Sequence, residues 1–323
     1  MNSFLVILYN FIAGVICLII GVNMMSSGLE KANPGIIKRI LSKLTSTAPL
    51  ALLTGTAVTA LLQSSTAVTV ITVGFVNSGM MKLSQAIGII YGANIGTTIT
   101  AQLMSFNLTN FALPIFIFGF LTKFFSPKIS LKSMGNALMG FGLMFIGIGI
   151  LNSGVPYIKD SEFAYNLFKN FGQNPFIGLL IGMVATMLVH SSSATVGLTI
   201  ILFNSGLISF EAAIGLTLGD NIGTCITAQM ASFGSSTAAR RTAWAHTIYN
   251  IIGVLLAIAL FTPFAGMVRY ITSTLGQDST RLIANTHTIF NILSAAVFLP
   301  FTGSFIKLIE KLIPGRKEGS RSF

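Results

Sequence analysis

Long hydrophobic stretches without a charged side chain alternate with short basic segments along the chain. The clearest stretches cover residues 4–29, 133–151 and 242–261. At about 1.5 Å per residue, a helix of this length crosses a hydrocarbon layer about 30 Å thick. The pattern therefore predicts an all-α polytopic membrane protein. The first stretch has no basic residue before it and no small-residue cleavage site after it, so we expect it to be retained rather than removed as a signal peptide.

A second pattern is an internal repeat with a constant separation of 127 residues. Residues 63–79 read QSSTAVTVITVGFVNSG and return at 190–206 as HSSSATVGLTIILFNSG. Residues 91–106 read YGANIGTTITAQLMSF and return at 218–233 as LGDNIGTCITAQMASF. From the start of the first segment to the end of the second, the copies share 21 identities in 44 positions without a gap. The chain therefore contains two copies of one structural unit.

Each copy contains a pair of apolar runs that are too short to be simple spans. Residues 49–62 and 175–189 are followed by a hydroxyl cluster and by a second short run that ends at Asn-Ser-Gly. Apolar runs of about 10 to 14 residues are more often re-entrant than spanning, and Asn-Ser-Gly suits a tight turn. We therefore expect a re-entrant helical hairpin in each copy, at about 48–79 and 175–206.

The helix after each hairpin is expected to be broken, because Gly92–Gly96 and Gly219–Gly223 place glycine and asparagine in mid-helix. Between the two copies, the hydropathy predicts three crossings, at 83–104, 111–125 and 133–151. An odd number of crossings inserts the second copy upside down, as in transporters with inverted-topology repeats. The expected organisation is a first inverted repeat, a second inverted repeat, a C-terminal helical segment and a basic tail, at 1–132, 133–262, 263–306 and 307–323 respectively.

Composition and charge support a membrane protein. Hydrophobic residues make up 53% of the chain and charged residues 8%, against about 25% charged residues in soluble domains. The net charge of +11 does not indicate a nucleic-acid partner, because the basic residues lie between hydrophobic stretches without an aromatic platform. Placing most of them in the cytoplasm puts the N-terminus outside and the C-terminus inside a bacterial plasma membrane. Cys17 and Cys225 predict no disulfide framework or metal cluster, and no catalytic constellation indicates an enzyme.

Polar side chains cluster at the tip of each predicted hairpin. An unpaired polar group in a bilayer costs several kcal/mol, so such clusters face protein, water or a ligand. Serine and threonine cap helix N-termini, whose free N–H groups and dipole favour an anion. Two inverted copies would aim two such tips at one point, which suits a compact anion with several acceptor oxygens; helix packing is the alternative role for these hydroxyls. The clusters are Gln63, Ser64, Ser65 and Thr66, and His190, Ser191, Ser192 and Ser193.

A second polar group lies in the helix after each hairpin. Amide and hydroxyl oxygens, together with unwound carbonyls, are the ligands that a small cation prefers. Asp220 is the only acidic residue that we place deep in the membrane, and its counterpart is Ala93, so the ligand charge differs between the copies. A structural carboxylate paired with a hydroxyl or an arginine is the alternative. The expected cation ligands are Asn94, Thr97, Thr98, Asp220, Asn221 and Thr224.

These motifs resemble those of the type II sodium-dependent phosphate cotransporter family. The resemblance covers most of the chain and includes the paired QSSS-like clusters, the two G-x-N-I-G-T motifs followed by T-A-Q, and the related segments 245–250 and 285–291. It implies sodium-driven symport of inorganic phosphate, with sodium as the coupling ion and no cofactor. The implied phosphate contacts are Ser64, Ser65, Thr66, Ser191, Ser192 and Ser193. The implied sodium contacts are Gln63, Asn94, Thr97, Asn221 and Thr224.

Two features depart from the family or stay open. The family usually has glutamine where His190 stands and serine where Thr66 stands, so we expect His190 to influence the pH response or the sodium coupling. In each late motif a histidine and an asparagine four residues apart share a helix face, which favours packing or a hydrogen-bonded latch over substrate contact. The alternative functions are a sodium- or proton-coupled symporter of another small oxyanion such as sulfate, an anion channel, and a structural or signalling subunit. The expected partners are phosphate, sodium and the lipid bilayer, and homodimerisation stays open.

Overall fold

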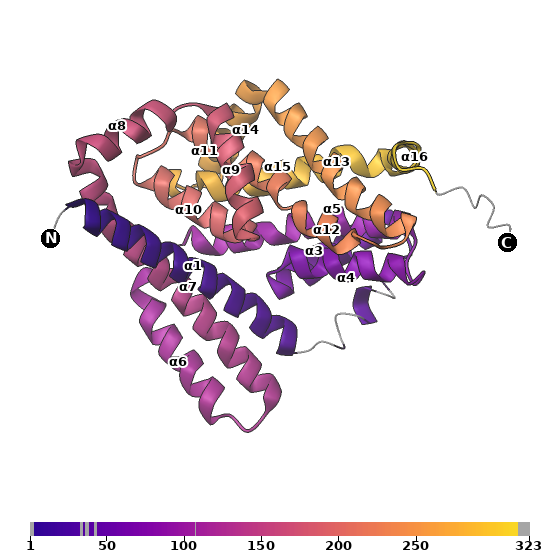
Figure 1. Cartoon of the computed structure of the whole chain (residues 1–323), viewed down its shortest axis with the longest axis horizontal. Coiled ribbons are helices and arrows are strands. Elements are labelled where there is room, and N and C mark those ends of the chain that lie inside the picture. Colours follow the sequence, from indigo (N-terminus) through magenta and orange to yellow (C-terminus); the bar gives the residue numbers. More distant parts are fainter. Residues whose placement is uncertain (1–2, 33–34, 36–38, 42–43, 107, 316–323) are drawn as a thin grey trace.

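The structure, a computed structural model, describes residues 3–32, 35, 39–41, 44–106 and 108–315 (Figure 1). Every regular element in this part of the chain is a helix, which confirms the predicted all-α class. The elements up to residue 125 are α1 (Ser3–Ala32), α3 (Ala48–Leu62), α4 (Ser65–Asn77), α5 (Leu83–Met104), η1 (Thr109–Phe111) and α6 (Ala112–Phe125). The later elements are α7 (Ile129–Asp160), α8 (Glu162–Phe171), α9 (Pro175–Val189), α10 (Ser192–Asn204), α11 (Phe210–Gly223), α12 (Ile226–Ser232), α13 (Thr237–Ala259), α14 (Phe261–Thr274), η2 (Ser279–Arg281), α15 (Leu282–Phe298), η3 (Leu299–Phe301) and α16 (Thr302–Leu312).

Several of these helices are suited to cross a membrane. Four stretches of the described residues are long and apolar enough: Leu5–Ala32, Ile129–Asp160, Thr237–Ala259 and Ser279–Leu312. Helix α5 and the segment Thr109–Phe125 add a fifth if they form one bent span. The prediction of a multi-pass membrane protein is therefore confirmed. Of the three elements predicted between the copies, only α7 crosses by its own length and composition, because α6 has 14 residues and α5 qualifies only as part of the bent pair.

Both predicted helical hairpins are present. Helices α3 and α4 meet at Gln63–Ser64, and helices α9 and α10 meet at His190–Ser191. At the far end of each hairpin the chain turns through a glycine in the left-handed region, where φ is +73° at both Gly79 and Gly206. The hairpins are violet and rose in Figure 1. The hydroxyl clusters therefore occupy the joints between half-helices, as the sequence predicts.

Glycines fix how the next helix packs on each hairpin. A Cβ added at Gly92 of α5 would lie 2.0 Å from the carbonyl oxygen of Leu52 in α3. A Cβ added at Gly219 of α11 would lie 2.0 Å from the carbonyl oxygen of Leu179 in α9, the equivalent pair in the second copy. Both contacts are between backbones, which small residues permit in membrane helices. The two copies therefore share one close packing of hairpin and following helix.

This packing explains why one predicted break is wrong. Helix α5 runs without interruption from Leu83 to Met104, so the expected break at Gly92–Gly96 does not occur. The glycines there give close helix contact instead of local unwinding. In the second copy α11 ends at Gly223 and α12 begins at Ile226, so the break lies directly after the predicted segment, at Thr224–Cys225.

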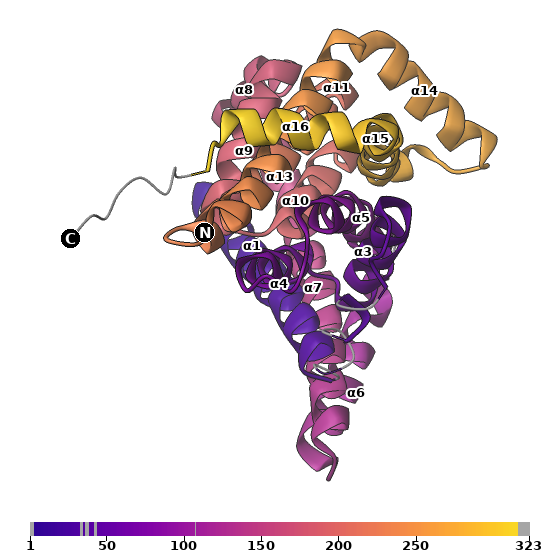
Figure 2. The same ribbon diagram turned by 90° about the vertical axis from the view of Figure 1, so that its right-hand side faces the viewer.

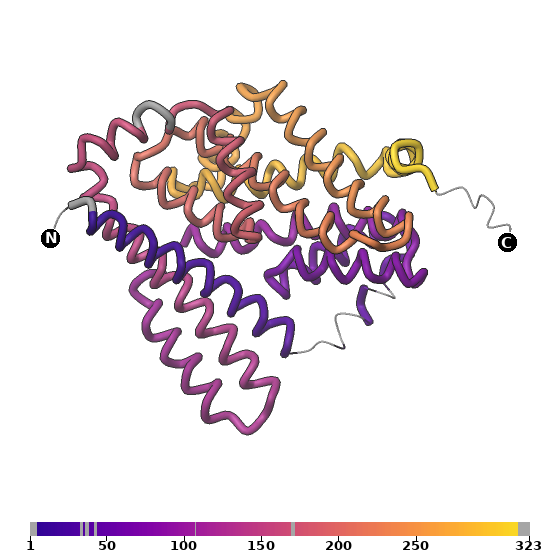
Figure 3. Tube along the Cα trace, viewed as in Figure 1, coloured from indigo at the N-terminus to yellow at the C-terminus, as the bar shows by residue number. Residues whose placement is uncertain are grey.

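The first helices of the two copies, α1 and α7, pack against each other in antiparallel order. Gly14 lies against Leu151, Gly21 against Met144, and Gly28 against Ala137, so contacts advance along α1 as they retreat along α7. Figures 1 and 3 show α1 and α7 running side by side along one edge of the body, with α6 beyond them. Figure 2 shows that α6, packed on the first part of α7, projects with it away from the remaining helices.

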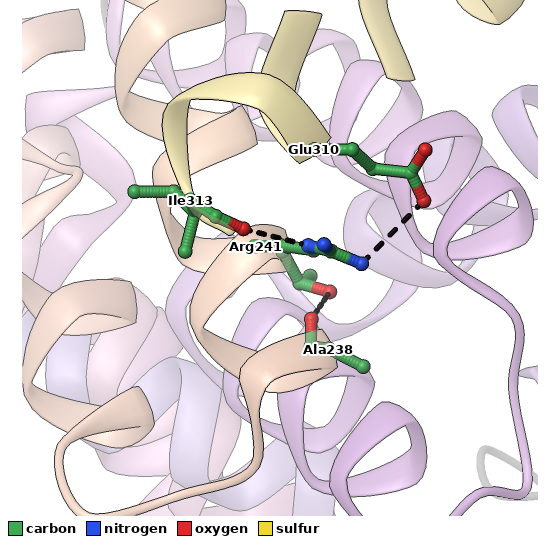
Figure 4. A network of polar contacts seen from close by, with 5 residues as sticks. Ala238, Arg241, Glu310 and Ile313 are labelled. Atoms are coloured by element: carbon green, nitrogen blue, oxygen red, sulfur yellow. Dashed lines mark hydrogen bonds and ion pairs between the residues drawn. The ribbon is translucent and has the colours of Figure 1, made fainter. Parts of the chain in front are cut away.

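The C-terminal helices hold the two copies together. Helix α13 packs on α4, α5 and α12, and α15 packs on α5, α10 and α11. Arg241 near the start of α13 anchors α16, since its Nε donates to the carbonyl oxygen of Ile313 at 3.0 Å and its Nη1 lies 3.5 Å from Glu310 Oε1 (Figure 4). The segment predicted as a basic tail thus begins within α16, and residues 316–323 lie outside the described residues.

Candidate substrate and cation site

The two hairpin tips have the same local structure. Gln63 and His190 both adopt the left-handed conformation with φ of 54°, which ends one half-helix and redirects the chain. Ser64 and Ser191 then cap the next half-helix. Ser64 Oγ accepts a hydrogen bond from the Ala67 N–H at 3.2 Å, and Ser191 Oγ accepts the equivalent bond at 3.3 Å. Each cap satisfies one of the first-turn N–H groups and leaves others for a ligand.

Both tips line one cavity of about 220 Å³. The cavity is large enough for a small oxyanion with water around it, since one water in the liquid takes about 30 Å³. All six residues predicted to contact the anion are among its lining, so the fold brings the two distant clusters together. The lining residues are Val22, Asn23, Ser26, Ser27, Glu30, Gln63, Ser64, Ser65, Thr66, Thr97, His190, Ser191, Ser192 and Ser193.

The wall supplied by α1 has no counterpart in the predicted site. Asn23, Ser26, Ser27 and Glu30 recur every three or four residues and so share one face of this helix. Ser26 Oγ donates to the carbonyl oxygen of Gln63 at 2.7 Å and thereby fixes the first tip. Glu30 is the only acidic side chain among the lining residues. The signal in the sequence was a polar stripe at helical spacing in the second half of an otherwise apolar span.

The side chain of Gln63, a predicted sodium ligand, is hydrogen-bonded to other residues of the first copy. Its Oε1 accepts a hydrogen bond from Thr100 Oγ1 at 2.7 Å, and its Nε2 donates to the carbonyl oxygen of Ala60. The side chain is buried, with 7% exposed. The amide therefore links the end of α3 to α5, through Ala60 and Thr100 respectively.

Asp220 is fully buried beneath the second tip. Its Oδ1 accepts a hydrogen bond from Thr186 Oγ1 at 2.8 Å, and that hydroxyl lies 2.9 Å from Thr195 Oγ1. Asp220 Oδ2 has no hydrogen-bond partner among the described residues, and none of their lysines or arginines pairs with the carboxylate. Thr186 also borders a narrow space that does not admit a water molecule, together with Thr66, His190, Ser192, Gly223, Thr224, Ile226 and Thr227.

The remaining predicted cation ligands divide between the cavity and the helix interfaces. Thr97 lines the cavity, whereas Thr224 borders the narrow space and its Oγ1 donates to the carbonyl oxygen of Asp220 at 2.9 Å. Asn94 instead binds α13, where its Nδ2 donates to Asn250 Oδ1 at 2.9 Å and its Oδ1 lies 3.3 Å from His246 Nε2. Two others bind backbone carbonyls of their own helix: Thr98 donates to Ile95 O at 2.7 Å, and Asn221 donates to Thr217 O at 2.8 Å.

Comparison with known proteins gives consistent matches. A family model described as Na+/Pi-cotransporter matches residues 17–153 and 160–293. An uncharacterized protein of Bacillus subtilis (strain 168), YqeW, is 34% identical over 97% of this chain and 100% of its own length. A putative inorganic phosphate export protein of Escherichia coli (strain K12), YjbB, is 27% identical over 96% of this chain, which spans only 56% of that relative. Sodium-dependent phosphate transport protein 2A of Rattus norvegicus is 26% identical over 57% of this chain and 30% of its own length. No solved structure matches the chain.

Proposed function

Because the chain belongs to the Na+/Pi-cotransporter family, a family of transporters and not of enzymes, we propose that it carries inorganic phosphate across the membrane together with sodium. The observation that carries this proposal is the single cavity between two capped helix N-termini. Free N–H groups and the positive end of each helix dipole favour an anion there. The hydroxyls of Ser65, Thr66, Ser192 and Ser193 supply further donors.

Glu30 favours phosphate over sulfate within this proposal. Hydrogen phosphate carries a proton that it can donate at neutral pH, whereas sulfate carries none. An ionised carboxylate only accepts hydrogen bonds, so it binds the first anion and is left unpaired beside the second. Because Glu30 is partly exposed, water can offset some of this loss, and we expect moderate discrimination against the analogue that lacks the proton.

Asp220 supports sodium as the coupling ion. The carboxylate, whose Oδ2 has no partner, and the hydroxyls of Thr186 and Thr195 form an oxygen-rich group, and no lysine or arginine of the described residues neutralises it. Hard cations take such oxygen ligands. Bound sodium would also offset the charge of the anion at the adjacent tip, so that each ligand favours the other by linkage. The first copy has Ala93 at the equivalent position, so we assign this site to the second copy alone.

The antiparallel packing of α1 and α7 supports the inverted arrangement of the copies. These helices lie at equivalent positions of the repeat, and opposite insertion would make them run in opposite directions. In this proposal the repeats meet at the cavity, which opens alternately to either side. We place the N-terminus outside and the C-terminus inside a bacterial plasma membrane, because that orientation leaves most basic loops in the cytoplasm.

Transport of radiolabelled phosphate by proteoliposomes tests the proposal. Uptake and release are both measured, with and without a sodium gradient, because the relative from Escherichia coli is called an export protein. We expect sodium-dependent movement against a phosphate gradient, and its loss in Ser64→Ala, Ser191→Ala and Ser192→Ala. Ser78→Ala is the matched control, since this exposed serine lies at the opposite end of the first hairpin. Passive equilibration would instead indicate a channel, and dependence on a pH gradient alone would indicate proton coupling.

A further inference from the structure

Helices α13 and α15 carry related sequences at a constant separation of 41 residues. The related segments run from Arg240 to Asn250 in α13 and from Arg281 to Asn291 at α15. They share arginine, alanine, histidine, threonine, isoleucine and asparagine at equivalent positions. The helices also meet equivalent glutamines of the two copies. Gln102 Nε2 donates to Thr288 Oγ1 at 2.9 Å, and Gln229 Nε2 donates to the equivalent Thr247 Oγ1 at 2.7 Å. Equivalent residues therefore form two related clusters, one for each copy.

The first cluster, formed by Gln102, Phe106 and Arg281, is closed. Arg281 Nη2 donates to Gln102 Oε1 at 2.7 Å. The Arg281 Cζ atom lies 4.1 Å from the centroid of the Phe106 ring, a cation–π contact. Asp278 caps the short helix η2, which ends at Arg281, because its Oδ1 accepts a hydrogen bond from the Thr280 N–H at 2.9 Å. This cap fixes the backbone position from which the Arg281 side chain extends.

The second cluster, formed by Gln229, Phe233 and Arg240, is open. The Arg240 side chain is exposed and makes no hydrogen bond, ion pair or ring contact within the described part of the chain. Phe233 is 92% exposed, whereas its equivalent Phe106 is 49% exposed. The three residues instead line a cavity of about 540 Å³. The neighbouring Arg241 is held by α16 (Figure 4), so Arg240 is the side chain that is free to move.

The open cluster lies at the end of the first hairpin that is remote from its tip. The Ser236 N–H, just before α13, donates to Asn77 Oδ1 at 2.8 Å, and Asn77 ends α4. Asn77 therefore ties the start of α13, and with it the open cluster, to the first hairpin.

We propose that the two clusters are alternating latches of the transport cycle, and that this structure is the state with the Arg281 latch closed and the Arg240 latch open. In the opposite state Arg240 would bind Gln229 and stack on Phe233, while Arg281 would release Gln102 and Phe106. Inverted repeats exchange conformations in this way when the binding site changes sides. The inference rests on the proposed transport function but does not require that phosphate is the substrate.

Thiol accessibility tests the latches without any transported substrate. Ser27→Cys in a Cys17→Ala background places a reporter in the wall of the cavity, and the background chain without the reporter measures any reaction of the buried Cys225. An impermeant maleimide is applied to either side of proteoliposomes. We expect Arg281→Ala to raise labelling from the side that is poorly labelled in the parent at least fivefold. Arg240→Ala should lower labelling from that same side, because it removes the latch of the opposite state.

Arg281→Lys separates the latch from a simple loss of folding. Lysine keeps the charge but lacks the planar fork that binds an amide and stacks on a ring together, so we expect an intermediate shift in labelling with unchanged thermal stability. Equal labelling ratios in the parent, Arg281→Ala and Arg240→Ala would overturn the proposal. Shifts in the same direction for both alanine variants would also overturn it, because the two latches must act oppositely.

Discussion

Replacing Gly92 by alanine tests the packing that holds each hairpin to the next helix. The added methyl would lie 2.0 Å from Leu52 O and 2.6 Å from Thr56 N, both backbone atoms that cannot rotate away. Ordinary contact begins near 3.4 Å. Helices α3 and α5 would therefore have to separate by about 1.4 Å, and the tip of the first hairpin, which is bound to α5 through Gln63 and Thr100, would move with them.

Two opposing effects set the magnitude. Overpacking costs up to about 3 kcal/mol, and the upper end applies because the clash is with backbone. Alanine in place of a helical glycine gains about 1 kcal/mol in helix propensity. The net loss is about 2 kcal/mol, enough to change the folded-to-unfolded ratio about 30-fold.

The assay is the fraction of detergent-solubilised protein that stays monodisperse on size exclusion after heating. We expect Gly92→Ala, and its equivalent Gly219→Ala, to lose this fraction at a lower temperature than the parent. Gly74→Ala is the matched control, because a Cβ in that part of α4 meets no atom within 4 Å and only the propensity gain remains. If Gly92→Ala were as stable as Gly74→Ala, the close packing of α3 on α5 would not be what stabilises the hairpin.

Three further predictions concern the site. Asp220→Asn should raise the sodium concentration for half-maximal phosphate transport at least tenfold, because it removes the charge of the proposed cation site; an unchanged sodium curve would place the ion elsewhere. Glu30→Gln should let sulfate compete with labelled phosphate, because an amide can donate to an anion that carries no proton; continued failure of sulfate to compete would exclude Glu30 from selection. His190→Gln gives the second tip the glutamine of the first and should alter the sodium dependence of transport, because this residue lines the cavity; an unchanged sodium curve would exclude His190 from the coupling.

Local sequence patterns predicted the hairpins and their tips because those features depend on neighbours in the chain. The half-helices end where Gln63 and His190 turn the backbone and Ser64 and Ser191 cap the next turn, which the hydroxyl clusters indicated. The constant separation of the repeat also predicted that the two tips have the same local structure, and the equal φ angles of Gln63 and His190 confirm this.

Features that depend on distant parts of the chain could not be predicted in the same way. A glycine in mid-helix permits either local unwinding or the close approach of another helix. At Gly92 the position of α3 shows that the glycine permits close approach. Likewise the sequence could not place His246 and Asn250 of α13 beside Asn94, a predicted cation ligand, because they lie far along the chain from it. The polar face of α1, with Glu30, became part of the site only because α1 crosses both hairpin tips.

The differences between the copies indicate how a symmetric scaffold can bind two unlike ions. The caps and the left-handed joints are the same in both copies, so an anion bound as proposed would meet two equivalent backbone surfaces. The side chains beneath the second tip differ, since Asp220 and Thr195 stand where the first copy has Ala93 and Val68. A cation bound there, as proposed, would order the second hairpin only. We therefore expect sodium to govern the position of the second tip and phosphate to require both tips. Binding of sodium would then favour binding of phosphate without direct contact between the two ions.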